Sequence, residues 1–99
     1  MNNNFLSPAD ICHDLAIRAR SARLAANLSQ AGLAERAGVS LGSLRRFESS
    51  GAASLELVAR VALALKAEDG FAALFKPQVY TTLDEALNTS TSRKRGRKK

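Results

Sequence analysis

A chain of 99 residues with a net charge of +6 has room for one small domain, which buries only about 60% of its unfolded surface and gains stability by associating. One cysteine excludes an intramolecular disulfide, and no apolar run of about 18 residues is present to span a membrane. The first residues lack the basic and apolar regions of a signal peptide, so we expect a cytoplasmic protein with no membrane partner.

The expected fold class is all-α, because Ala and Leu are prominent among the 45% hydrophobic residues and only two prolines are present. Ser7 followed by Pro8 is typical of a helix start, and the first helix is predicted to run to about residue 26. Its apolar side chains recur with helical period and should face the core: Ile11, Leu15, Ala19, Ala22 and Ala26.

Two short helices with a tight turn between them are predicted next, over residues 30–37 and 41–49. Ser29 and Ser40 are suited to cap them, and Gly38 supplies the positive φ that ends the first. Val39 is expected as a buried pivot, with Leu44 and Phe47 on the inner face of the second helix. This arrangement is typical of a helix-turn-helix, whose second helix enters the major groove of DNA.

The remaining elements complete a domain over residues 1–76. Ser54 is expected to cap a fourth helix over 55–66, which is apolar almost all round and should therefore be central. Asp69 is expected to cap a short fifth helix over 70–75. Residues 77–87 form a short extension, and 88–99 are polar and then charged, which predicts a disordered basic tail.

The central segment resembles the Xre/Cro/cI-type helix-turn-helix regulators, with matching spacing over Leu28-Ser29-Gln30, Leu33-Ala34, Ala37-Gly38-Val39-Ser40, Leu44 and Phe47-Glu48. The resemblance implies a compact five-helix, lambda-repressor-like DNA-binding domain. Two positions depart from the family pattern. The family usually has a glycine two residues after the glutamate, where this chain has Ser50 and places Gly51 one residue later, and Ala53 replaces a common proline. The segment 44–75 and the basic end are similar to HipB-type repressors of toxin–antitoxin operons, which implies a toxin protein as a possible partner.

The outer face of the second helix of the motif supplies most of the candidate DNA-binding residues. Arg46 is expected to grip a guanine with two hydrogen bonds and Arg45 to reach a phosphate, the alternative being that both are solvated charges. Ser40 and Ser43 can donate hydrogen bonds to phosphates or bases, and Leu41 can touch a thymine methyl.

Two further candidates depend on their position in the motif. Gly42 either lets the backbone approach DNA closely or is simply tolerated at a cost of about 1 kcal/mol relative to alanine. Gln30 matches the family position that anchors a helix end against the sugar-phosphate backbone, the alternative being a solvated side chain. Arg23 and Glu48 occupy positions that form a charge pair in some members, which links the first helix to the end of the third. Such a pair would be structural and would orient the recognition helix, whereas a surface pair alone would contribute only about 0–1 kcal/mol.

The basic tail holds the whole net charge, since residues 1–92 have nine basic and nine acidic residues. Its cations are Arg93, Lys94, Arg95, Arg97, Lys98 and Lys99. Such a segment can neutralise DNA phosphates without reading sequence. The alternatives are a solubilising end or a tail for RNA or another acidic surface.

The leading function is therefore a sequence-specific repressor that binds double-stranded DNA as a homodimer on a palindromic operator. The alternatives are an antitoxin that holds a toxin and regulates its own operon, and a non-specific nucleic-acid binder that uses the tail. No catalytic set, metal site or cofactor is predicted. Cys12 beside His13 invites a metal or thiol function, but ordinary helix residues are preferred, because ligand sets need three or four residues.

Overall fold

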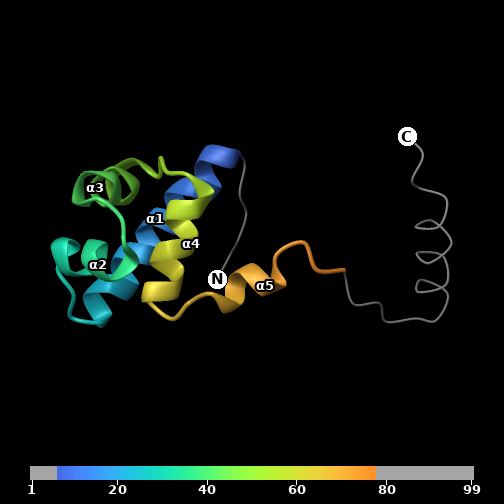
Figure 1. The fold of residues 1–99 in the computed structure, drawn as a ribbon. Helices are drawn as coiled ribbons and strands as arrows, with labels where there is room; N and C mark the ends of the chain where they lie inside the picture. The colour runs from blue at the N-terminus through green and yellow to red at the C-terminus, as the bar shows by residue number, and fades with distance from the viewer. Residues whose placement is uncertain (1–6, 78–99) are drawn as a thin grey trace, which may run out of the picture.

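The computed structural model describes residues 7–77, which form five α-helices: α1 (Pro8–Ala25), α2 (Gln30–Ala37), α3 (Leu41–Ser50), α4 (Leu55–Ala64) and α5 (Asp69–Ala73). In the packing, α1 contacts α3, α2 contacts both α3 and α4, and Figure 1 shows α2 and α3 on one side of the domain with α5 leading away from it. The extension beyond Pro77 and the basic tail lie outside the described residues.

Four serines begin the first four helices, as the sequence predicts. The side chains of Ser7, Ser29, Ser40 and Ser54 each accept a hydrogen bond from a backbone N–H of the first turn. Each bond satisfies one of the N–H groups that a helix leaves without a partner at its start. The predicted cap of the fifth helix is wrong: Asp69 is its first helical residue, and Glu68 before it makes no side-chain capping bond.

The turn between α2 and α3 is also as predicted. Gly38 ends α2 in the left-handed conformation, with φ 71° and ψ 35°. The Val39 N–H then reaches back to the Ala34 carbonyl at 3.0 Å, which closes the turn. Val39 is half-buried rather than fully buried, and it packs against the core from its edge.

The core is small and gathers where α1, α2, α3 and α4 meet. Leu33 and Leu44 are 0% exposed, and Phe47 and Val61 are 1% and 2% exposed. The other buried apolar residues are Ala16, Ala34, Ala37 and Leu57. Both helices of the motif therefore place their inner faces in one apolar cluster, which fixes their relative orientation.

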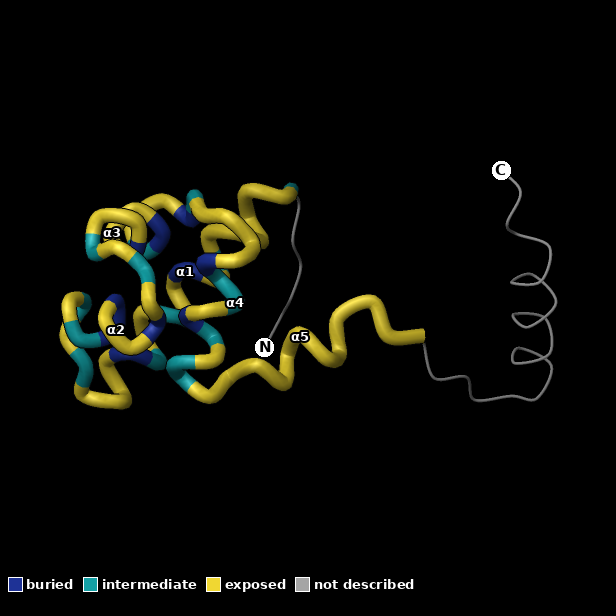
Figure 2. The backbone as a smooth tube through the Cα atoms, viewed as in Figure 1, coloured by how far each residue is buried: buried dark blue, intermediate teal, exposed yellow. Residues whose placement is uncertain are grey.

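Two expectations about the helices are wrong in whole or in part. The fourth helix ends at Ala64, before Lys66 with φ 59°, and it is not central, since Leu55 and Leu63 are 73% and 61% exposed. The predicted apolar stripe of α1 faces the core only in part, because Ala19 packs against the core whereas Ile11 and Leu15 stay 44% and 41% exposed. Figure 2 shows α5 exposed along its length; none of its residues is buried, and Ile11 and Leu15 border an open groove beside it instead of packing under it.

Candidate nucleic-acid interface

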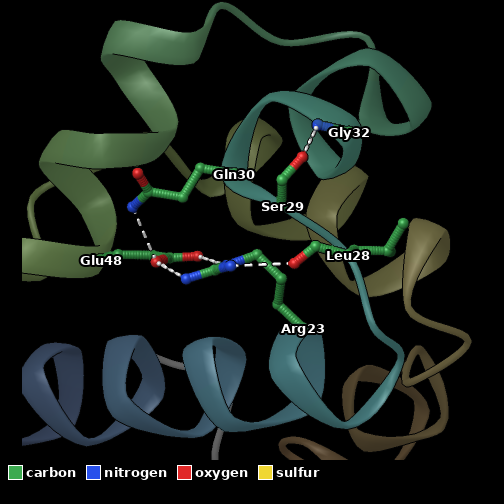
Figure 3. Close-up of polar contacts among 6 residues, drawn as sticks. All are labelled: Arg23, Leu28, Ser29, Gln30, Gly32 and Glu48. Carbon is green, nitrogen blue, oxygen red and sulfur yellow. Dashed lines mark hydrogen bonds and ion pairs between the residues drawn. The ribbon is translucent and has the colours of Figure 1, made fainter.

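A buried ion pair holds α3 against α1 (Figure 3). Arg23 of α1 donates through Nε to Glu48 Oε2 at 2.8 Å and through Nη2 to Glu48 Oε1 at 3.0 Å. The charge pair that the family positions imply is therefore present, and it is buried, since the two side chains are only 8% and 3% exposed. The pair is buried because Arg23 lies on the core side of α1, beneath the start of α2. Two parallel hydrogen bonds between the ions fix geometry as well as adding energy.

Two further hydrogen bonds complete this network. The Nη1 of Arg23 donates to the Leu28 carbonyl at 2.9 Å, and the Nε2 of Gln30 donates to Glu48 Oε1 at 3.0 Å. The Glu48 carboxylate thereby joins α3 to α1 and to the first residue of α2, and Arg23 extends the network to the loop before α2. Among the described residues, every buried side-chain nitrogen and oxygen has a hydrogen-bond partner. The orientation of α3 is therefore set by a satisfied polar network in addition to its apolar inner face.

The end of α3 is fixed by Gly51, the residue that departs from the family spacing. Its φ of 82° is left-handed, and its N–H closes the helix on the Phe47 carbonyl at 2.8 Å. A Cβ at this position would lie 3.0 Å from both the carbonyl carbon and the carbonyl oxygen of Cys12 in α1. Glycine is thus required twice, by the backbone conformation and by the close passage of α1.

The outer face of α3 carries the predicted polar side chains into solvent. Gly42, Ser43, Arg45 and Arg46 are all exposed. Within residues 7–77, neither arginine side chain forms an ion pair. Leu41 differs from the expectation of a free outer residue, because it is half-buried and packs against the core. The free cationic groups of α3 are therefore gathered on one face, away from the core.

The serines at the start of α3 are not equivalent. Ser40 accepts the capping bond from the Ser43 N–H at 3.1 Å and donates its own proton to Ser43 Oγ at 2.7 Å. Its hydroxyl is engaged in both directions, whereas the hydroxyl proton of Ser43 is left available to an external acceptor. Gln30 is half-buried and uses one amide proton on Glu48, which leaves its second amide proton available.

Chain order alone does not reveal two of these contacts. The bond from Gln30 to Glu48 joins residues 18 apart, and the approach of Gly51 to Cys12 joins residues in different helices. The only sequence signal was the placement of Arg23, Gln30 and Glu48 at family positions. Cys12 is exposed, and in the part of the chain that the structure describes no group of three or more His, Cys, Asp or Glu side chains is placed to hold a metal ion.

Comparison with protein families decides what this motif is. The model described as "Helix-turn-helix" matches residues 20–68, from the last third of α1 past the end of α4. The chain is an Xre/cI-type helix-turn-helix protein. No curated protein matches it. The chain is a DNA-binding transcriptional regulator. The domain type is regulatory and not usually catalytic. Between residues 7 and 77, no helix is both long and apolar enough to cross a bilayer.

Proposed function

We propose that this regulator is a repressor that reads a specific DNA sequence with α3 in the major groove. The observation that carries the proposal is the division of α3 into two faces, a buried inner face at Leu44 and Phe47 and an exposed outer face without ion pairs. The residues proposed to contact DNA are Gln30, Ser40, Leu41, Gly42, Ser43, Arg45 and Arg46. We expect the protein to lie in the cytoplasm, associated with the nucleoid.

The two arginines have different proposed roles. Arg46 lies one turn after Gly42 and Ser43 and is proposed to bind the O6 and N7 atoms of a guanine, a contact worth about 1–3 kcal/mol of discrimination. Arg45, beside that face, is proposed to bind a phosphate. Ser43 and the second amide proton of Gln30 are proposed to donate to the DNA, and the exposed part of Leu41 to touch a thymine methyl. Phosphate contacts would then fix the register in which Arg46 reads its base.

A single recognition helix reads too few base pairs to select one operator, so we propose a two-fold dimer on a palindrome. The surface that supports a second copy lies at α5, where Phe71, Leu74 and Phe75 are 37%, 57% and 94% exposed. Phe71 and Leu74 also line an apolar groove of about 420 Å³ with Ile11 and Leu15 of α1. Interfaces between copies bury about 800 Å² on each partner and have aromatic residues in their cores.

The antitoxin function remains the second hypothesis, and the same exposed groove is the observation that favours it. A toxin seated between α1 and α5 would leave the outer face of α3 open to DNA. A non-specific function through the tail depends on residues 93–99, which lie outside the described residues. Co-purification of the tagged chain from its native host distinguishes these functions, because a stable protein partner favours the antitoxin and its absence favours a simple regulator.

The proposed function is tested by selecting duplexes from a random double-stranded DNA library with the purified chain. We expect enrichment of a palindrome that contains a guanine in each half-site. Arg46→Ala should lose the preference for this palindrome while keeping its thermal midpoint. Arg60→Ala is the matched control, since Arg60 is an exposed arginine of α4 that pairs with Glu56 of its own helix. Failure to enrich any sequence, or undiminished preference in Arg46→Ala, would contradict the proposal.

Repression is tested separately with a reporter gene under the promoter that carries the enriched site. Expression of the chain should lower reporter output, and Arg46→Ala should not. An increase in output would identify an activator instead.

A further inference from the structure

Gly42 is a glycine that the fold does not require. It is the second residue of α3, its φ lies outside the left-handed region, and a Cβ built on it meets nothing within 4 Å. Alanine is the better helix former at such a position, because glycine has more backbone freedom to lose. Local rules of this kind are broken most often at functional sites.

Other glycines of the domain have structural reasons that Gly42 lacks. Gly38 and Gly51 adopt φ values of 71° and 82°, where side chains are strained. A Cβ on Gly32 would lie 3.2 Å from the Ser29 hydroxyl that caps its own helix. Only Gly70, among the described glycines, shares with Gly42 an ordinary φ and open space around its Cβ position.

The side chains next to Gly42 leave the backbone of the first turn of α3 accessible. Leu41 before it is turned toward the core, and Ser43 after it has a short side chain. The next side chains on this face are Arg45 and Arg46, about one helical turn away. The first turn of α3 is therefore the part of the outer face where the helix backbone itself comes nearest to whatever the helix docks against.

We infer that Gly42 sets the depth at which α3 enters the major groove, with its Cα against the edge of a base pair, and that it is a specificity-determining residue. This inference rests on the proposed function. Because the Arg23–Glu48 pair and the passage of Gly51 against α1 hold α3 in place, a methyl group added at Gly42 cannot be absorbed by a shift of the helix alone. The whole domain would move away from the DNA, and the two hydrogen bonds from Arg46 to its base would lengthen.

The test compares Gly42→Ala with the wild-type chain on two duplexes, the one enriched from the random library and a scrambled duplex of equal composition. Fluorescence anisotropy gives Kd for each, and circular dichroism gives the thermal midpoint. Gly70→Ala, the same exchange at the second residue of α5, is the thermal control. We expect neither substitution to lower the midpoint, and we expect Gly42→Ala to weaken binding to the enriched duplex at least about fivefold, a typical effect of overpacking a close contact. Its Kd for the scrambled duplex should stay within about twofold.

Three results would overturn the inference. The first is unchanged affinity of Gly42→Ala for the enriched duplex, which would mean that the backbone does not approach the bases. The second is an equal loss on both duplexes, which would place the effect in phosphate contacts. The third is a lower midpoint for Gly42→Ala but not for Gly70→Ala, which would give Gly42 a role in folding. If the wild-type chain enriches no duplex at all, it is the proposed function that fails.

Discussion

Replacing Glu48 with alanine should destabilise the domain more than any other exchange of a charged residue between Ser7 and Pro77. The substitution leaves the guanidinium of Arg23, only 8% exposed, with the Leu28 carbonyl as its remaining bonded partner, and it removes the acceptor of Gln30. Breaking a buried ion pair from one side costs about 3–5 kcal/mol. Domains of this kind are stable by about 5–15 kcal/mol, so Glu48→Ala should lose at least about a fifth of that stability.

The assay is thermal unfolding followed by circular dichroism at 222 nm, which reports the helices directly. A loss of 1 kcal/mol lowers the midpoint by about 4–8 °C in a domain of 60–100 residues. Glu48→Ala should therefore lower it by at least about 12 °C. Glu56→Ala is the matched control, because the Arg60–Glu56 pair has the same chemistry at 3.0 Å but side chains that are 49% and 73% exposed. That exposed pair should contribute less than about 1 kcal/mol.

A second variant separates the effect of the unpaired charge from that of the missing side-chain packing. The double variant Arg23→Met with Glu48→Leu replaces the ion pair with apolar side chains, an exchange that is often neutral or stabilising. Its midpoint should recover most of the loss seen in Glu48→Ala. A shift in Glu48→Ala no larger than in Glu56→Ala would refute the reasoning. So would a double variant as unstable as the single one, because the loss would then not come from a stranded charge.

Three further outcomes are expected. Gly51→Ala should lower stability by about 1–3 kcal/mol in urea unfolding, since φ of 82° and the Cys12 backbone at 3.0 Å both oppose a Cβ; an unchanged midpoint would contradict this. Leu74→Asp should weaken self-association measured by light scattering without lowering the thermal midpoint, because Leu74 is 57% exposed; a dimer of unchanged strength would remove α5 from the interface. Deleting residues 93–99 should weaken binding to the enriched and scrambled duplexes by similar factors. It should also reduce the slope of log affinity against log salt concentration by about 0.9 for each phosphate that is no longer neutralised, and an unchanged slope would mean that the tail does not touch DNA.

The features that sequence predicted well are those set by neighbouring residues. A serine oxygen reaches an N–H three residues ahead, so Ser29, Ser40 and Ser54 mark helix starts without knowledge of the fold. Gly38 marks a helix end for a similarly local reason. Leu44 and Phe47 were assigned to the inner face from helical periodicity, and both are buried. The helix-turn-helix and its family therefore follow from a short segment of sequence.

The errors concern how many elements surround a residue, which a local pattern does not encode. Leu63 belongs to an apolar helix, yet it is 61% exposed because α5 does not cover it. The family positions of Arg23 and Glu48 implied a pair but not its burial, which depends on how α2 and α3 pack against α1. The need for glycine at position 51 comes from the backbone of α1, which passes within contact distance although Cys12 is far away in sequence. The candidate DNA contacts of α3 are still predictions, and the experiments above test them.

The separation of the two faces of α3 has a consequence for how such a regulator diverges. Stability depends on Leu44, Phe47 and Glu48, whereas the exposed positions between them make no contact with the core. Exposed substitutions of this kind usually change stability by less than about 0.5 kcal/mol. After a gene duplication, one copy can therefore exchange its outward residues step by step and acquire a different operator, while every intermediate still folds. Leu41 is the exception: it packs against the core from the same turn, so a change there alters the scaffold together with the surface that meets the DNA.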